Sequence, residues 1–383
     1  MHSLRSTIIL IVPQNPTTPL PLAPCLLPLA CLLPIIPPHM ETESTQSTMR
    51  QPQFWLGIVV SLVCLAAIFI FIEPAEILAA LRTARYGYLG LAGVCIVAFM
   101  VLRAVRWRFM LNSGRNQDGG VPYSKVFHIQ NIGYMLNNLL PFRLGDVARA
   151  VLIGSVPPLS ISQGLSTMVV ERVFDLLFMV ILFPFTLVAV TELPPEINTA
   201  VQITGLIAIA ATIILIIAAN QRRRAAKIAA VILERIPFLN TAVWLKRFDD
   251  LLLGLNTLTR PKDGLILIIL SIIVWLPIFL GYYLAMLAAN IQPTLIEATF
   301  VACVAAFSVA APSSPGQVGV FEAGVTFALV AILGHPDAES GSFAFLYHAS
   351  NYIVLGLLGA IGINRTSSTF SSVIASARAL TAR

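Results

Sequence analysis

The sequence predicts an all-α membrane protein, a polytopic helical bundle of about eight spans with broken or re-entrant helices. Of its 383 residues, 57% are hydrophobic and 11% are charged, and the mean hydropathy is +0.85. Soluble domains carry about 25% charged residues, so these charges are too few to cover a water-facing surface. From residue 54 onward apolar runs recur at regular intervals, and most reach the roughly 20 residues that a spanning helix needs. Lipid is therefore the expected solvent for most of the chain.

The first 48 residues differ from the rest. Nine prolines interrupt every apolar stretch there, and a helix does not pass through prolines at that density. A signal peptide needs an unbroken apolar segment and fits poorly. We expect a disordered tail or an overextended gene start, with the initiator left open between Met1, Met40 and Met49. The predicted parts are a tail over 1–48, a transmembrane domain over 49–365 and a short C-terminal tail over 366–383.

The apolar runs after the tail predict the individual spans. One further stretch, 124–140, is apolar but carries histidine, glutamine and asparagine side chains and stops at Pro141. It predicts a re-entrant or half-spanning helix. The eight expected spans cover residues 54–72, 86–108, 162–190, 199–219, 264–287, 295–311, 320–334 and 343–363.

Basic residues predict the orientation of these spans. The densest basic cluster lies within 222–247, between the fourth and fifth spans. Such clusters face the cytoplasm, which places both termini there too, in a cell (inner) membrane. The net charge of +6 then reflects orientation and anionic lipid, and no nucleic-acid partner is expected. Within that loop, residues 244–255 form an amphipathic pattern that predicts a helix on the membrane surface or packed against the bundle.

Two charged groups lie at or near helix breaks. Arg103 and Arg106, at the end of the second span, share a helix face. Either they bind a ligand, or their long side chains extend to the membrane–water interface. The second group follows the half-spanning helix, where Pro141 and Gly145 break the chain. A helix starting near Gly145 would favour an anion at its amino terminus, and arginine suits phosphate oxygens; an ordinary loop is the alternative. The polar residues of this stretch are Asn137, Asn138, Arg143, Asp146 and Arg149.

Two further groups place carboxylates inside apolar segments. Glu171 and Asp175 are four residues apart and share one helix face, while Arg172 lies beside them and needs a carboxylate. Intramembrane charges suggest a functional site, although an ion-pair network that holds helices together is a serious alternative. The last group is a second break with Gly316 and Gly319, followed by Glu322. We expect Glu322 to stabilise the first turn of a helix or to pair with an arginine of the first two groups.

The two breaks share a spacing, since Pro141 precedes Gly145 and Pro315 precedes Gly319 by four residues. Paired broken helices in a membrane protein point to a transport-type site. His128 and His348 are isolated in the sequence and predict polar core contacts rather than a metal site. Neither a nucleotide loop nor a metal cluster is recognisable, so no metal or cofactor is expected.

In this order, the four groups resemble the lysylphosphatidylglycerol synthase transmembrane region, a flippase-like integral membrane family. The resemblance covers roughly residues 54–363, with Asp146 standing where the family often has Glu. The matching motifs are Arg103-x-x-Arg106-Trp107, Asn138-x-x-Pro141-x-Arg143-x-Gly145-Asp146-x-x-Arg149, Glu171-Arg172-x-x-Asp175 and Pro315-Gly316-x-x-Gly319-x-x-Glu322.

This resemblance implies an inner-membrane bundle that handles lipids. In multidomain synthases of the family this region looks like the part that flips an aminoacylated phospholipid, while a soluble domain, not recognised in this chain, makes it. Some members accompany polyprenyl-linked sugar pathways. We therefore expect a non-enzymatic protein that translocates or binds membrane lipid, either anionic or polyprenyl-phosphate-linked.

The predicted lipid site divides its polar residues by charge. Arg103, Arg106, Arg143 and Arg149 would hold a phosphate head group, with hydrogen bonds from Asn137 and Asn138. The carboxylates of Glu171, Asp175 and Glu322 would balance the arginines or bind a cationic substituent. A lipid-modifying transferase that uses Glu171 or Asp175 as a base, and a non-catalytic partner of a glycosyltransferase, are the alternatives.

Overall fold

The computed structural model describes most of the chain from residue 52 onward. The expectations for the 1–48 tail, for the start codon, for the amphipathic segment 244–255 and for nearly all of the C-terminal tail lie outside the described residues. The described ranges are 52–113, 120–140, 143–192, 194–233, 245, 261–310 and 314–366.

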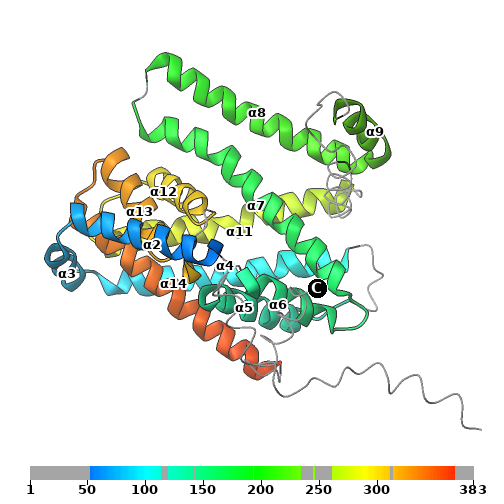
Figure 1. The fold of residues 1–383 in the computed structure, drawn as a ribbon, viewed down its shortest axis with the longest axis horizontal. Coiled ribbons are helices and arrows are strands. Elements are labelled where there is room, and N and C mark those ends of the chain that lie inside the picture. Colours follow the sequence, from blue (N-terminus) through cyan, green and yellow to red (C-terminus); the bar gives the residue numbers. More distant parts are fainter. Residues whose placement is uncertain are drawn as a thin grey trace, which may run out of the picture. The chain divides into compact units, whose positions relative to one another are not determined.

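Helices make up the described part of the chain (Figure 1), and the all-α membrane bundle is confirmed. Lipid offers the backbone no hydrogen-bond partners, so its N–H and C=O groups must pair within the segment, and a helix pairs them all. In chain order the elements are α2 Pro52–Phe71, α3 Pro74–Arg82, α4 Tyr86–Asn112, α5 Tyr123–Leu139, α6 Leu144–Gly154, α7 Ile161–Val190, α8 Pro195–Asn220, α9 Arg222–Leu233, α11 Pro261–Ala288, α12 Leu295–Ser308, the 3₁₀ turn η5 Pro315–Gln317, α13 Val320–Phe327, the π-helical η6 Ala328–Ile332 and α14 Asp337–Arg365.

Six helical segments among the described residues are long and apolar enough to cross a membrane, or seven if the bent pair of α2 and α3 is one span. Of the eight expected spans, the sixth, 295–311, is the one that falls short: its helix α12 has 14 residues and ends before the break that precedes η5. A capping box at Thr294 and Glu297 fixes its start. Which side of the membrane each end faces stays a prediction.

The stretch expected to be re-entrant is α5, which is 17 residues long. It packs against α6 on one side and α14 on another. As predicted, α6 begins beside Gly145, with Arg143 at its amino-terminal cap in the left-handed conformation (φ 53°). A non-glycine residue in that region is strained and often marks a functional site. Thus α5 and α6 form a hairpin of two short helices inside the bundle.

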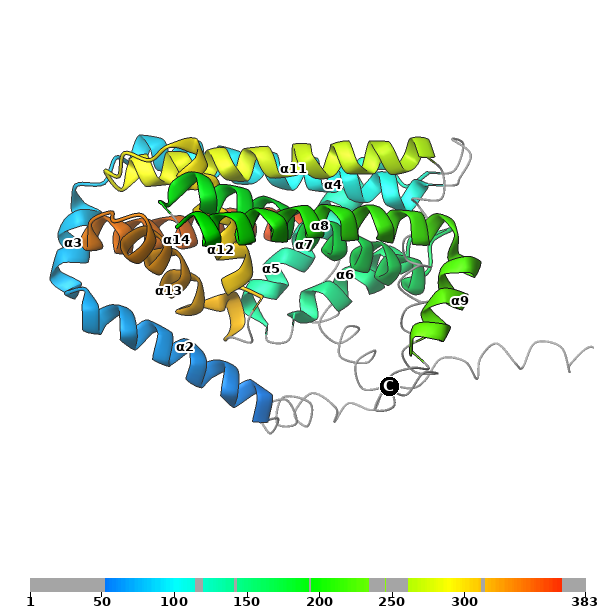
Figure 2. The same ribbon diagram turned by 90° about the horizontal axis from the view of Figure 1, so that it is seen from above.

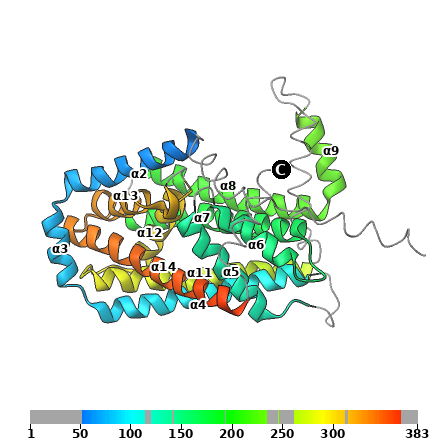
Figure 3. The same cartoon turned by 60° about the horizontal axis from the view of Figure 1, so that its bottom comes forward.

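The hydrophobic core lies around the hairpin and the broken helices. α4 and α11 run side by side along most of their length (Figure 2), and α2 packs on α13 (Figure 3). One core cluster, with Phe300, Phe343 and Tyr347, joins α11, α12, α13 and α14. A second, with Trp107 and Phe174, joins α4, α5, α6, α7 and α11. The two clusters flank the polar residues described below.

Two glycines allow α5 and α6 to pack closely. A Cβ on Gly145 would lie 2.0 Å from the carbonyl oxygen of Gly133, whereas a Cβ on Gly90 of α4 would meet nothing within 4 Å. We predict that Gly145→Ala lowers the thermal unfolding temperature of the detergent-solubilised protein, because overpacking of this kind costs about 1–3 kcal/mol.

The matched control is Gly90→Ala, which we expect to melt at or above the wild-type temperature because alanine favours helix over glycine. Equal melting of Gly145→Ala and wild type would contradict the close backbone approach.

Candidate functional site

Glu171 of α7 lies at the centre of a buried ionic cluster. Its Oε1 accepts a hydrogen bond from Arg103 Nε at 2.6 Å and lies 3.8 Å from Arg106 Nη2. Its Oε2 accepts from Arg149 Nη2 at 2.7 Å. Glu171 is 1% exposed, so these charges interact in a low-dielectric setting. One carboxylate therefore ties α4 and α6 to α7.

Asp175, one helical turn further along α7, completes the cluster. Its two oxygens lie 2.6 Å from Arg103 Nη2 and 2.8 Å from Arg106 Nη2. Because residues four apart share a helix face, both carboxylates meet the same face of α4. The first and third groups singled out in the sequence thus come together. The ion-pair network considered for the third group is present and also holds Arg106 and Arg149, which are 0% and 1% exposed; Arg106 does not reach out to the membrane interface.

Aromatic rings enclose the guanidinium groups of the cluster. The guanidinium carbon of Arg149 lies 3.8 Å from the centre of the Trp107 ring, in cation–π contact. The Tyr134 ring on α5 lies 5.1 Å from the guanidinium of Arg103, and its hydroxyl donates to Glu171 at 3.2 Å. Such contacts stabilise buried guanidinium groups that outnumber the carboxylates beside them.

A second layer forms around Asp146 in the first turn of α6. Asn137 donates from its side chain to Asp146 at 3.0 Å and accepts from the Asp146 backbone amide at 3.2 Å. Arg143 and Arg172 approach the same carboxylate at 3.3 Å and 3.4 Å. Two arginines thus balance this one largely buried carboxylate. The carboxylate that Arg172 was expected to need is Asp146.

The two layers together carry a surplus of positive charge. Five arginines face three carboxylates, which leaves a formal charge of +2. In a membrane bundle such a surplus is costly unless an anion or water compensates it. The cations are Arg103, Arg106, Arg143, Arg149 and Arg172, and the anions are Asp146, Glu171 and Asp175.

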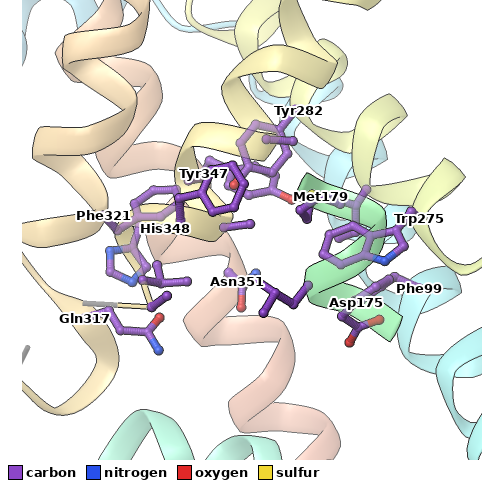
Figure 4. A pocket seen from close by; sticks show the side chains of 18 of the residues that line it. Phe99, Asp175, Met179, Trp275, Tyr282, Gln317, Phe321, Tyr347, His348 and Asn351 are labelled. Atoms are coloured by element: carbon purple, nitrogen blue, oxygen red, sulfur yellow. The ribbon is translucent and has the colours of Figure 1, made fainter. Parts of the chain in front are cut away.

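A cavity of about 390 Å³ borders this cluster. Arg103, Asn138, Arg143, Arg172 and Asp175 line its charged end. Its walls are otherwise largely aromatic and aliphatic, with groups from α4, α7, α11, α12 and α14 (Figure 4). The cavity therefore combines fixed cations with an apolar surface.

The second break forms the other end of the cavity. Gly316 and Gly319 adopt positive φ of 71° and 86°, and a Cβ on Gly316 would lie 1.2 Å from the Tyr352 hydroxyl and 3.0 Å from the Asn138 carbonyl oxygen. The break is thus seated on α14 and touches the end of α5. The end of α5, which precedes the first break, therefore meets the second break in the fold.

The expected pairing of Glu322 with an arginine is not found. Its Oε2 accepts from the Gly319 amide at 2.7 Å, as predicted for a first-turn carboxylate, but its Oε1 contacts His348 Nδ1. Arg103, Arg106 and Arg149 are held by Glu171 and Asp175, and Arg143 by Asp146. His348 is therefore not isolated.

The predicted site residues divide into two sets. Arg106 and Arg149 lie behind the cavity wall, with their charges directed to carboxylates, and Asn137 acts on Asp146. The set that lines the cavity consists of Arg103, Asn138, Arg143, Arg172 and Asp175. Gly316, Gly319 and Glu322 belong to the break that borders the cavity, and Gly316 lies against Asn138.

Several contributors were missed from the sequence. Tyr134 lies one turn before Asn138, a spacing that could have assigned it to the same face. Trp275, Asn351 and Tyr352 lie in largely apolar segments with no local signal. Gln317 lies inside the predicted second break, and His348 was expected only to make a polar core contact. The structure places all five on the cavity wall.

The cluster makes a prediction for stability. Glu171→Gln leaves three buried arginines without a shared carboxylate, so it should destabilise the fold by about 3–5 kcal/mol, read as a lower unfolding temperature. The control Glu192→Gln changes an exposed carboxylate and should leave the temperature unchanged. Adding Arg149→Met to Glu171→Gln should recover part of the loss; a double variant that shows the full sum of both single losses would contradict the coupling.

Comparison with known proteins places this arrangement in a family. The profile of the lysylphosphatidylglycerol synthase TM region matches residues 54–359. A UPF0104 membrane protein of Methanocaldococcus jannaschii is 31% identical over 231 residues, 59% of this chain and 92% of that protein. Another, from Methanothermobacter thermautotrophicus, is 23% identical over 313 residues, 79% of this chain and 90% of that protein.

A shorter similarity points to a named enzyme. Glycosyltransferase AglD of Haloferax volcanii is 30% identical over 122 residues, which cover 32% of this chain and 19% of that protein. No solved structure is significantly similar. The profile covers well over half of the chain and its apolar helices agree with it, so this multi-pass membrane protein belongs to the lysylphosphatidylglycerol synthase TM region family.

Proposed function

We propose that the protein translocates or binds an anionic lipid, a phospholipid or a polyprenyl-phosphate-linked glycan, without nucleotide hydrolysis. The observation that carries the proposal is the +2 surplus of the arginine cluster at one end of a largely apolar cavity. A charged head attached to a long apolar chain is the ligand class that needs both surfaces at once.

The arginine side of the cavity has hydrogen-bond donors that remain available to a ligand. Arg143 and Arg172 keep 48% and 35% of their side chains exposed, and Arg103 and Asn138 lie beside them on the wall. Guanidinium groups match phosphate oxygens in geometry and stay charged at any physiological pH. A phosphate here would neutralise the surplus that the three carboxylates leave.

The apolar wall of the cavity suits the start of an acyl or prenyl chain. Phe99, Trp275 and Phe307 line it together with Met179 and Ile278, and the Phe99 ring lies 5.2 Å from the guanidinium carbon of Arg103, so apolar surface adjoins the fixed charge (Figure 4). A volume of about 390 Å³ is enough for a head group but not for whole lipid tails. The tails would remain in the bilayer beside the bundle, as expected for a lipid that moves its head through a protein.

The comparisons leave room for a second role. Since one relative is named a glycosyltransferase, this chain could serve such an enzyme as a non-catalytic membrane partner or hand it a lipid-linked substrate in the cell membrane. A transferase activity of the chain itself is disfavoured, because Glu171 and Asp175, the predicted bases, are both held by arginines.

The test is lipid movement in liposomes that contain the purified protein. With fluorescent phosphatidylglycerol or a polyprenyl-phosphate sugar as probe, we expect movement between leaflets to slow by about tenfold in Arg143→Gln, because a charge-assisted hydrogen bond contributes about 1.5–3 kcal/mol. The measurement is the fraction of probe that a membrane-impermeant quencher reaches with time.

Arg82→Gln is the matched control, since Arg82 is exposed in the last turn of α3 and does not line the cavity; this variant should move lipid at the wild-type rate. If Arg143→Gln and wild type behave alike across anionic and neutral lipids, the proposed function is wrong. Product formation without any added partner would favour the transferase instead.

A further inference from the structure

His348 lies between two hydrogen-bond acceptors. Its Nδ1 faces Glu322 Oε1, and its Nε2 lies 3.0 Å from the carbonyl oxygen of Gly316. A neutral imidazole carries one N–H and can donate to only one of these partners. Both contacts form together only if the pair holds one proton more than neutral histidine and ionised glutamate.

The surroundings of Glu322 indicate where that proton sits. Glu322 Oε2 already accepts from the Gly319 amide at 2.7 Å, at the amino terminus of α13, where the helix dipole favours negative charge. This arrangement stabilises the carboxylate, so the extra proton belongs on the imidazole ring. The ring would then donate from both nitrogens.

The charged groups across the cavity are held in ion pairs of their own. Among the described residues the ion pairs of Glu322 involve His348 alone, whereas the carboxylates across the cavity are held by arginines. Tyr352 on α14 contacts the ring, and the other titratable or charged groups that line the same cavity are Tyr347 on α14, Tyr282 on α11, Arg103 on α4, Asp175 and Arg172 on α7, and Arg143 at the start of α6.

From this geometry we infer that Glu322 and His348 form a proton-binding site that holds the Pro315–Gly319 break against α14. Imidazole takes up one proton to become imidazolium, and both contacts close. Loss of the proton leaves a ring lone pair opposite either the carboxylate or the Gly316 carbonyl, and that contact opens. Histidine is the side chain whose charge changes most readily near neutral pH.

The break that this site holds is tightly seated. Gly316 has no room for a side chain against Tyr352, and a Cβ on Gly319 would lie 2.2 Å from the Ser61 carbonyl oxygen of α2. Ser61 also accepts from the Ser314 amide at 2.9 Å. Opening the His348 contact would therefore free a segment that touches α2, α5 and α14 together and forms part of the cavity wall (Figure 4).

Use of this site to couple lipid movement to a proton gradient rests on the proposed function, but proton binding itself does not. The first experiment is solid-state NMR of the full chain, labelled with ¹⁵N-histidine, in liposomes of phosphatidylglycerol and phosphatidylethanolamine. The His348 signals are assigned from their loss in His348→Gln. At neutral pH we expect both ring nitrogens of wild-type His348 to be protonated.

Glu322→Gln should convert His348 to a ring with one protonated nitrogen, while His335→Gln, which removes a histidine of the loop before α14, should leave the His348 signals unchanged. A singly protonated His348 in the wild type overturns the inference whether or not the variants fold. So does a doubly protonated ring that persists in Glu322→Gln.

Lipid movement provides the second measurement and separates the two proposals. We expect the wild-type rate to change with pH and that change to be lost in Glu322→Gln and kept in His335→Gln. A protonated His348 with no lipid movement in any liposome leaves the proton site standing and removes the proposed function. Lipid movement with a singly protonated His348 supports the proposed function and removes the proton site.

Discussion

The bundle depends on the shared carboxylate of Glu171. Three guanidinium groups from α4 and α6 converge on one side chain of α7, deep in a setting where an unpaired charge costs several kcal/mol. The same contacts fix the position of the α5–α6 hairpin, because Tyr134 and Arg149 bring both short helices to this point. Helices too short to span the membrane are thus held by charge as well as by packing.

The hairpin in turn positions the second break. α5 ends where its Asn138 carbonyl meets Gly316, and glycine is needed there because its positive φ and the close Tyr352 hydroxyl leave no space for a side chain. Non-helical backbone at membrane depth is tolerated where it is buried in protein or lines a polar cavity. The second break satisfies that condition by lying against the end of α5 and beside the cavity.

Local chemistry in the sequence predicted much of this arrangement. Apolar run lengths located the long helices, proline and glycine located both breaks, and the four-residue spacing of Glu171 and Asp175 put them on one face. The partners of buried charges could not be predicted, because they depend on which helices pack together. Glu322 illustrates this: its first-turn position predicted the amide contact, but only the fold brings His348 to its other oxygen. Trp275 lies in a helix that is apolar on every face, so its sequence does not indicate which face lines the cavity.

The two buried glutamates are equally enclosed but differ in what surrounds them. Glu171 is surrounded by arginines, whose charge does not change at any physiological pH, so its end of the cavity keeps a fixed positive surplus. Glu322 has a histidine and a backbone amide as partners, and histidine changes its charge readily. A fixed cationic wall can attract an anion but gives no means of releasing it. A wall whose charge changes with one proton can supply that step, because the break it holds borders the same cavity.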